Sequence, residues 1–367
     1  MQQRPYKRIA VKIGSNVLTR SDRTLDITRM SSLVDQIATL HKSGIEVIMI
    51  TSGAVASGRG ELKEISRKAL DPVSARQLFS AVGQAKLINR YYEFFREHEI
   101  PCGQILTTKE NFSTRLHYLT QKHCMEVMLE NGVIPVVNEN DTVSVTELMF
   151  TDNDELSGLI ASMMSADALV ILSNIDGVYD GDPCDESSKV IPDIYAEAKI
   201  DSDTFIQSSK SSCGRGGMGT KYRISQKVSD EGIAVIIANG KRDNILIDIA
   251  KADRKTPFTL FHPNEHPTSS VKKWIAHSEG FAKGQIHIND GAYQALISTK
   301  ATSLLPVGVT EIVGDFEKDD IVRIISPTGE PFAVGRIGVD SNKAASLIGT
   351  QGAKPLIHYN YLYIENM

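Results

Sequence analysis

The chain has 367 residues, 41% of them hydrophobic and 23% charged, a composition that suits two folded domains and excludes a largely disordered protein. Its 40 basic and 45 acidic residues give a formal net charge of -5 without a block of like charge, which argues against a dominant nucleic-acid partner. No apolar run approaches the roughly 18 residues of a membrane span, and the first residues lack the apolar region of a signal peptide. We therefore expect a cytoplasmic protein.

The cysteines are few and lie far apart in the sequence. They are Cys102, Cys124, Cys184 and Cys213, and they form no CxxC pair. Neither a disulfide framework nor a zinc site is indicated. We expect free, buried thiols.

The N-terminal region begins with a strand, predicted over Ile9–Val17 from its β-branched residues and the Gly-Ser-Asn turn that closes it. Lys12 is unusual there, because a lysine inside an apolar strand needs an anionic partner or a route to solvent. A crossover helix over Thr28–His41 and a buried strand over Ile45–Ile50 follow. That strand runs into Thr51–Ala54, where small residues let a ligand approach the backbone.

Strands and helices continue to alternate as far as Phe261. The pattern predicts helices over Ser74–Glu97, Arg115–Glu130 and Lys221–Asp230 and strands over Cys102–Thr107, Val133–Val137, Ala168–Leu172 and Ile233–Ala238, and Ile245–Ala250 and Phe258–Phe261 complete it. Gly83 lies inside the first of these helices at a cost of about 1 kcal/mol relative to alanine, which indicates close packing or ligand approach. The alternation predicts an α/β fold with a parallel sheet covered on both faces.

Two polar clusters flank the region after the fourth predicted strand. Asn138–Asp141 leaves the end of that strand, and Asp152–Glu155 opens an apolar-periodic helix. Turn chemistry and helix capping account for either cluster alone. Two acid-amide clusters at the carboxyl end of a strand together favour a ligand site.

The segment Ser208–Thr220 is rich in glycine and serine, and we expect no regular structure in it. Gly214, Gly216 and Gly219 match GxGxxG, but no strand precedes them, so a dinucleotide fold is not predicted. A GxxxxGK[ST] motif is also absent from the sequence. A flexible linker is one interpretation; a glycine-rich loop leading into Lys221 at a helix start instead predicts a phosphate site.

These features form one set at one edge of the predicted sheet. Lysines, glycine amides and carboxylates suit phosphoryl transfer, which needs charge stabilisation and alignment more than covalent help. An acceptor carboxylate with a pKa of roughly 4 is ionised at neutral pH and needs no general base. The set is Lys12, Gly14, Ser52, Gly53, Asp141, Asn153, Asp154 and Lys221.

The C-terminal part has a different texture, with short strands and turn signals from Lys283 onward that predict a small β-rich domain. His262 and His266 lie among prolines rather than on a helix, so we do not predict a metal pair. The predicted domains are 1–262 and 281–367, joined by a linker at 263–280.

The chain resembles the glutamate 5-kinase group of the amino acid kinase family over most of Ile9–Phe261. The order NEND, DNDxLS and GGMxTK distinguishes this group from the acetylglutamate, aspartate, carbamate and uridylate kinases. The segments QIHINDGAYQALIST and SLLPVGVTEIVGDF resemble a PUA domain. The motifs are VKIGSN around Lys12, ITSGAVASG around Ser52, AVGQ at Ala81–Gln84, PVVNENDTV around Asp141, FTDNDELSGLIA around Asn153 and GRGGMGTK ending at Lys221.

The resemblance implies a three-layer kinase domain that uses ATP to phosphorylate the side-chain carboxylate of L-glutamate, giving glutamyl 5-phosphate, the first step of proline synthesis. Mg²⁺ is expected to arrive with ATP rather than in a protein cage. A homo-oligomer and feedback inhibition by proline are also implied. By motif position, Lys12, Lys221 and Asp154 are catalytic; Ser52, Gly53, Asp141 and Asn153 bind glutamate; and Lys12, Gly14, Ser173, Asn174, Arg215, Gly216, Gly217, Met218, Gly219, Thr220 and Lys221 bind the nucleotide.

The sequence departs from the family pattern at two places. Ser173-Asn174 stands where Thr-Asp is frequent, so a carboxylate contact to the nucleotide is lost or replaced. Arg215 stands where a small hydroxyl residue is common in the family, and it is expected either to add a contact to the phosphate or ribose or to face solvent.

Two alternative functions are open on the sequence. One is another amino acid kinase with a different acid or carbamate as acceptor. The other is an RNA-binding or regulatory role of the PUA-like domain. Ile348–Gly352 is similar to the GxxG loop of KH domains, but Pro355 would interrupt the helix that such a loop requires.

Overall fold

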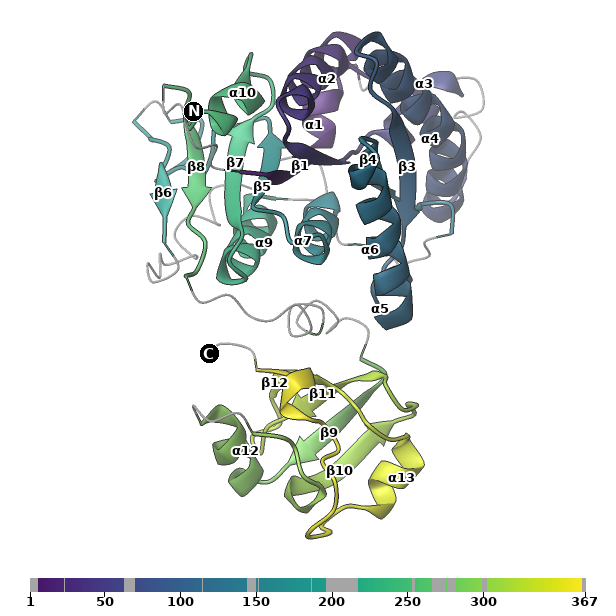
Figure 1. The fold of residues 1–367 in the computed structure, drawn as a ribbon, viewed down its shortest axis with the longest axis vertical. Coiled ribbons are helices and arrows are strands. Elements are labelled where there is room, and N and C mark those ends of the chain that lie inside the picture. Colours follow the sequence, from purple (N-terminus) through teal and green to yellow (C-terminus); the bar gives the residue numbers. More distant parts are fainter. Residues whose placement is uncertain are drawn as a thin grey trace. The chain divides into compact units, whose positions relative to one another are not determined.

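The computed structural model forms two compact units, Met1–Thr108 with Thr120–Pro267 and Lys109–Leu119 with Thr268–Met367 (Figure 1). Most of the predicted linker lies outside the described residues, and the domain limits at 262 and 281 stay predictions. The structure describes residues 6–22, 24–62, 70–113, 115–143, 150, 152–185, 187–195, 217–252, 255–265, 275, 282–298 and 302–364.

An eight-stranded sheet forms the centre of the first unit, with the order β3-β4-β2-β1-β5-β7-β8-β6. The strands from β3 to β7 in this order pair in parallel, as the alternating pattern predicts. The strands are β1 (Arg8–Ile13), β2 (Glu46–Ile50), β3 (Cys102–Thr107), β4 (Ile134–Glu139), β5 (Ala168–Ser173), β6 (Asp193–Ile194), β7 (Ala234–Asn239) and β8 (Phe258–Phe261).

The predicted parallel sheet is confirmed except at one edge, where β8 runs antiparallel to β7 and β6 pairs in parallel with β8. Residues 240–257 connect β7 to β8 and contain helix α10 (Ile245–Ala250). Parallel neighbours need a connection of a dozen or more residues, so the length of this connection does not by itself dictate the reversal.

Helices cover both faces of this sheet (Figure 1). Helices α2 and α10 lie on one face and contact each other, and α7 and α9 do the same on the other face. The described helices between β1 and β8 along the sequence are α1 (Ser15–Leu18), α2 (Ile27–Lys42), α3 (Ala54–Glu61), α4 (Pro72–Glu97), α5 (Glu110–Ser113), α6 (Arg115–Glu130), α7 (Asn153–Met163), α9 (Met218–Asp230) and α10.

Among the element limits that differ from the sequence-based predictions, three concern the predicted site residues. Strand β1 ends at Ile13, because the amides of Val17 and Leu18 turn back to the carbonyl of Gly14 and start a short helix. Strand β4 continues to Glu139 and so contains two residues of the first polar cluster. Helix α9 begins at Met218, after an extended Gly217 as N-cap, so part of the glycine-rich segment is helical.

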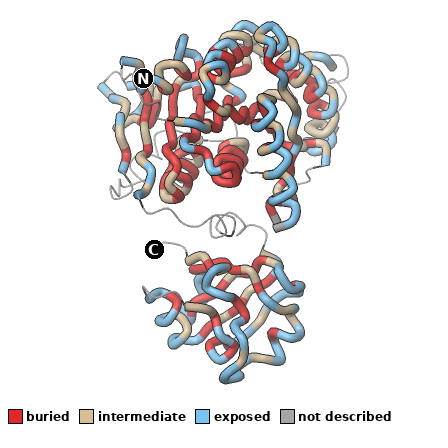
Figure 2. Tube along the Cα trace, in the orientation of Figure 1, coloured by how far each residue is buried: buried red, intermediate tan, exposed pale blue. Residues whose placement is uncertain are grey.

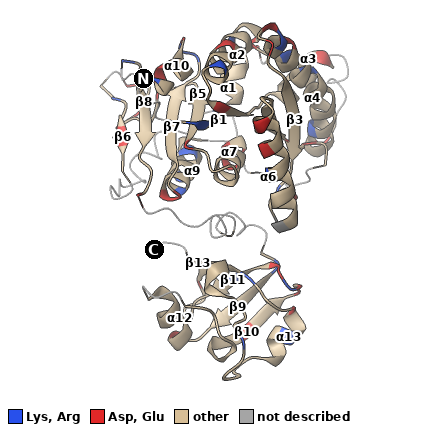
Figure 3. Ribbon diagram, in the orientation of Figure 1, with Lys and Arg blue, Asp and Glu red and all other residues tan. Residues whose placement is uncertain are grey.

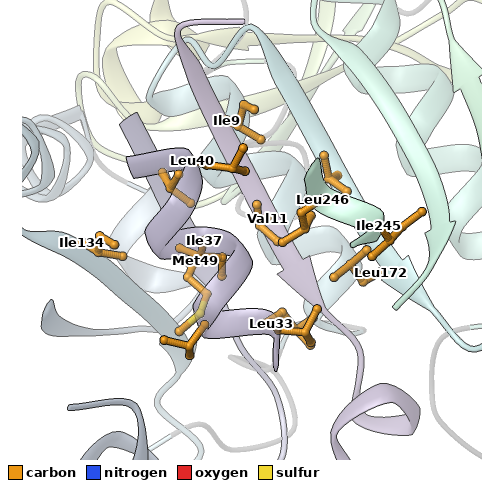
Figure 4. Packing of buried hydrophobic residues seen from close by; sticks show 14 of the residues in the cluster. Ile9, Val11, Leu33, Ile37, Leu40, Met49, Ile134, Leu172, Ile245 and Leu246 are labelled. Atoms are coloured by element: carbon orange, nitrogen blue, oxygen red, sulfur yellow. The ribbon is translucent and has the colours of Figure 1, made fainter. Parts of the chain in front are cut away.

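The face that a strand residue occupies alternates along the chain, and β1 shows the consequence for the site. Ile9, Val11 and Ile13 join the main hydrophobic core under α2 and α10 (Figure 4). Lys12 lies on the opposite face, which α7 covers. Figure 2 shows the strands around β1 and helix α7 as mostly buried, so Lys12 is surrounded by protein.

The second unit contains a five-stranded sheet in the order β10-β9-β11-β12-β13, which confirms the prediction of a small β-rich domain. Its own core gathers around Ile286, Phe316, Ile324 and Ile357. The elements are β9 (Gly284–Ile288), β10 (Val309–Gly314), β11 (Ile321–Ile325), β12 (Pro331–Arg336), β13 (Leu362–Ile364), α12 (Asp290–Ile297) and α13 (Ser341–Ser346), with short 3-10 turns at Pro306–Gly308 and Tyr359–Tyr361.

The prediction of buried thiols is wrong for two cysteines. Cys124 and Cys184 are exposed, whereas Cys102 is partly buried, and burial raises the pKa of its thiol to about 11. Cys213 lies outside the described residues. Among the helices that the structure describes, none combines the length and the apolar character needed to span a bilayer.

Helices α3 and α4 cross in close contact through two glycines. A Cβ atom on Gly83 would lie 1.8 Å from the carbonyl oxygen of Ala54, and one on Gly58 would lie 1.8 Å from that of Phe79. Such distances are far below van der Waals contact, and the obstructing atoms are backbone atoms that cannot rotate away. Close packing, one of the two explanations offered for Gly83, therefore accounts for a glycine within α4.

Replacing Gly83 by alanine should separate α3 from α4 and destabilise the protein by about 1–3 kcal/mol, the range for overpacked cores. Gly60→Ala is the matched control on α3, because nothing lies within 4 Å of its Cβ position, and it should stabilise by up to about 1 kcal/mol. Thermal unfolding followed by circular dichroism measures both changes. A Gly83→Ala variant as stable as the parent would contradict the packing argument.

Candidate active site

The candidate site lies at the carboxyl edge of the parallel strands. A helix that connects parallel strands runs antiparallel to them, so α7, which follows β4, and α9, which precedes β7, both begin at this edge. Strand β1 lies between β2 and β5, the point at which the strand order reverses and where open α/β sheets bind ligands. Acidic residues of α7 and basic residues of α9 lie on neighbouring helices (Figure 3).

The buried carboxylate of Asp154 pairs with two other predicted site residues. Oδ1 of Asp154 lies 2.5 Å from Nζ of Lys12, and Oδ2 lies 2.9 Å from Nζ of Lys221. The Asp154 side chain is 1% exposed, and those of Lys12 and Lys221 are 7% and 11% exposed. Burial raises the pKa of Asp154, but the two lysines lower it by more, so its net pKa lies below the ordinary value. The structure thus brings together side chains from β1, α7 and α9.

The start of α7 orients this carboxylate. Asp152 is the N-cap, and its Oδ1 accepts hydrogen bonds from the backbone amides of Asp154 and Glu155, at 2.9 and 3.0 Å. This satisfies amide donors that a helix N-terminus otherwise leaves open. Burial raises the pKa of Asp152, and the nearby charge of Asp154 raises it further. The capping explanation for the second cluster is therefore correct for Asp152, while Asp154 is used elsewhere.

Asn153, next on α7, points to the other half of the site. Its Nδ2 donates toward the Thr51 carbonyl at 2.7 Å, Ser52 Oγ at 3.0 Å and Asn138 Oδ1 at 3.1 Å. Asn138 in turn donates to Oε1 of Gln84 at 2.7 Å. Two predicted glutamate-binding residues, Ser52 and Asn153, are therefore in direct contact, and amide groups connect the ends of β2 and β4 to α4.

Asp141 belongs to a separate ionic cluster at the end of β4. Arg76 of α4 donates through Nε to Oδ1 of Asp141 at 2.7 Å and through Nη2 to Oε2 of Glu139 at 2.9 Å. The hydroxyl of Ser80 donates to Oδ2 of Asp141 at 3.2 Å. Sequence analysis missed Arg76. The available signal was the spacing of Arg76, Ser80 and Gln84, which puts three polar residues on one face of a long helix.

The predicted glycines have different roles. The amide of Gly14 donates to the carbonyl of Leu172 at 3.1 Å and so is already used within the sheet. A Cβ atom there would lie 3.0 Å from that oxygen and 3.7 Å from Nζ of Lys12, so Gly14 leaves room beside the lysine. Gly53 has a φ of 101° as the N-cap of α3, a backbone conformation that favours glycine.

The predicted nucleotide residues follow β5 and open α9. Ser173 is buried at the end of β5, and Asn174 is exposed. Gly217 is the N-cap of α9 and Met218, Gly219 and Thr220 form its first turn, partly exposed and directly before Lys221. Arg215 and Gly216 lie outside the described residues.

A second arginine missed by sequence analysis holds the loop after β5. Nε and Nη2 of Arg242 each lie 2.6 Å from an oxygen of Asp176, and Nδ2 of Asn239 donates to Oδ1 at 3.1 Å. The hydrogen bond from Arg242 lowers the pKa of Asp176. Because the pairing partners are far apart in sequence, no local motif indicates this contact.

Of the two histidines considered for a metal pair, His262 contacts a carboxylate and an aromatic ring. Nε2 of His262 lies 2.8 Å from Oδ1 of Asp193, and its ring stacks on Tyr195. His266 is not among the described residues. Within the part of the chain that the structure describes, no group of three or more His, Cys, Asp or Glu side chains is arranged to hold a metal ion.

Sequence comparisons match two families to the chain, the amino acid kinase family over residues 7–239 and the PUA domain over residues 284–358. A glutamate 5-kinase from Bacteroides thetaiotaomicron is 66% identical over 98% of this chain and 99% of its own length. One from Chlorobaculum tepidum is 47% identical over 98% of both chains.

One solved structure has a similar fold. The structure of an isopentenyl phosphate kinase in complex with its substrate superposes with a TM-score of 0.51 at 17% identity, over 70% of this chain and all of the other. At that identity the likeness concerns the fold alone. From the two family matches and the extent of the sequence identity, the chain belongs to the amino acid kinase family and has a C-terminal PUA domain.

Proposed function

We propose that this kinase transfers the terminal phosphoryl group of ATP to the side-chain carboxylate of L-glutamate, which gives glutamyl 5-phosphate and ADP and begins proline synthesis. The relatives that are 66% and 47% identical to this chain are glutamate 5-kinases, and the matches cover nearly their whole length. The observation that carries the proposal is the buried Lys12–Asp154–Lys221 cluster, which suits the stabilisation of a phosphoryl group in transfer.

In this proposal, Lys12 and Lys221 contact the ATP phosphates and Asp154 positions both. Two ammonium groups held by one carboxylate lie close together, so both can approach one phosphoryl group. A negative phosphate takes up the positive charge that the single carboxylate leaves unbalanced. The start of α9 adds open amide donors and a positive helix end beside Lys221, consistent with nucleotide binding by Gly217–Thr220.

The acceptor would bind on the other side of α7. Ser52, Gly53 and Asn153 offer hydroxyl and amide groups to a carboxylic acid, and Asp141 offers a negative charge to its ammonium group. The oxygen of the glutamate side chain attacks the terminal phosphorus while the bond from that phosphorus to the oxygen of ADP breaks. The attacking carboxylate has an ordinary pKa of about 4.3, so no protein group has to remove a proton.

Magnesium is proposed to arrive with ATP and to neutralise phosphate charge. Asp152 fits such a hydrated ion, because its Oδ2 is buried and has no hydrogen-bond partner among the described residues. The protein itself would hold the lysines, the phosphates and the acceptor in line. Ser173 and Asn174 would contact the nucleotide from the end of β5.

The remaining proposals concern organisation and regulation. We propose a kinase domain up to residue 262 and a PUA domain from 281, a homo-oligomer, and inhibition by proline. A coupled assay with glutamate, ATP and Mg²⁺, with and without proline, tests the reaction and the inhibition together. Faster turnover of another acid would favour the rival kinase activity, and a salt-dependent RNA affinity would favour the binding role.

Lys12→Ala and Lys221→Ala should each lower kcat by about 100- to 1,000-fold, the scale of removing one transition-state contact. Lys86→Ala is the control, because Lys86 pairs with Glu61 at the surface and should retain full activity. The coupled assay gives kcat, and circular dichroism shows whether each variant is folded. Near-normal turnover of either folded variant would reject the role of that lysine.

Asp141→Asn should raise KM for glutamate by about tenfold or more, because an amide cannot replace a carboxylate as the counter-charge of an ammonium group. KM for ATP should change little. Glu93→Gln, at the surface of α4, serves as the control for loss of a negative charge. Equal increases of the two KM values would contradict the assignment of Asp141 to the acceptor.

A further inference from the structure

Helix α4 places a row of polar side chains over the end of β4. Arg76, Ser80 and Gln84 are spaced by four residues and therefore lie on one face of the helix. Arg76 and Ser80 contact Asp141, and Gln84 accepts a hydrogen bond from Asn138. This face of α4 thus reaches both the ionic cluster and the amide network of the site.

Arg76 contacts two carboxylates at once. Its Nε lies 2.7 Å from Oδ1 of Asp141, its Nη2 contacts the same oxygen, and Nη2 also lies 2.9 Å from Oε2 of Glu139. The side chains of Asp141 and Glu139 are 9% and 4% exposed, and that of Arg76 is 18% exposed. A planar guanidinium presents several donors in a fixed fork, which the single ammonium group of lysine cannot reproduce.

The cluster also ties down the chain on both sides of residues 144–149. The second oxygen of Glu139, Oε1, accepts from the amide of Phe150 at 3.0 Å. Beside Arg76, Gln77 donates to the carbonyl of Thr142 at 2.9 Å. Two carboxylates separated by one residue would repel each other without a shared cation, so Arg76 allows Glu139 and Asp141 to keep these positions.

We propose that Arg76 is a positioning residue for the acceptor, which sets the orientation of the Asp141 carboxylate and thereby the selection of substrates with a free α-ammonium group. Arg76 engages Oδ1, and the hydroxyl of Ser80 fixes the direction of Oδ2. A carboxylate held in this way meets an ammonium group without first reorganising. The inference rests on the proposed function, in which Asp141 receives the ammonium group of glutamate.

Calorimetric titration of the folded full-length chain with glutamate, with glutarate and with ATP tests the proposal. Glutarate has both carboxylates of glutamate but no ammonium group. Arg76→Met should raise Kd for glutamate by about 10- to 100-fold, the scale of a misplaced binding group, and leave Kd for ATP nearly unchanged. The ratio of Kd for glutarate to Kd for glutamate should fall, because the ammonium group loses its positioned partner.

Two further variants separate positioning from simple packing. Arg76→Lys keeps the charge and loses the fork, so it should fall between the parent and Arg76→Met. Adding Glu139→Gln to Arg76→Met removes the repelling carboxylate and keeps an acceptor for the Phe150 amide, so it should recover part of the glutamate affinity. These two variants also decide the question if Arg76→Met fails to fold. Arg90→Met is the control on the exposed side of α4.

Unchanged glutamate binding in Arg76→Met would overturn the proposal, as would an equal loss of affinity for glutamate and glutarate. The same holds if Glu139→Gln brings no recovery. A parent protein that turns over no glutamate in the coupled assay would instead reject the proposed function, and the role of Arg76 with it. The two failures are therefore distinguishable.

Discussion

The pairing of one buried carboxylate with two lysines is the constraint on which the site depends. Asp154 is almost inaccessible, and an isolated charge in such a place would be strongly unfavourable. Lys12 and Lys221 compensate it, and they come from strands and helices at distant points of the sequence. Residues at both ends of the first unit must therefore be in place before the charges are balanced. The same requirement brings the two ammonium groups close together, as the proposed phosphoryl transfer would need.

Helix α7 divides the site into two sides. Its N-cap, Asp152, accepts hydrogen bonds from the backbone amides of Asp154 and Glu155 through one oxygen and so fixes the backbone of the first turn. Asp154 faces the lysines, whereas Asn153 faces the ends of β2 and β4. Consecutive residues in the first turn of a helix point about 100° apart. In the proposed reaction, the start of α7 would thus serve the nucleotide on one side and glutamate on the other.

Sequence analysis predicted the parts of this arrangement that local patterns encode. Apolar alternation located the parallel strands, and Lys12 stood out because a charge inside a buried strand requires a partner. The polar residues at strand and helix ends indicated a site because two such clusters at the carboxyl end of a strand together favour a ligand. What the sequence left unpredicted depends on contacts across the fold: β8 pairs antiparallel with β7, and the Asp176–Arg242 pair joins two separate loops. Neither leaves a periodic or motif signal in one stretch of sequence.

The α4 face shows why polar residues inside helices are easily overlooked. Amphipathic patterns lead one to assign apolar residues to the interior and polar ones to solvent, yet Arg76, Ser80 and Gln84 point inward, and their partners lie at the end of β4. The same helix approaches α3 closely because Gly83 has no side chain. Since Gly53 is the N-cap of α3 and directly follows Ser52, the α3–α4 contact also positions Ser52 relative to this polar face. The packing of the glycines and the proposed glutamate site are therefore coupled through one helix.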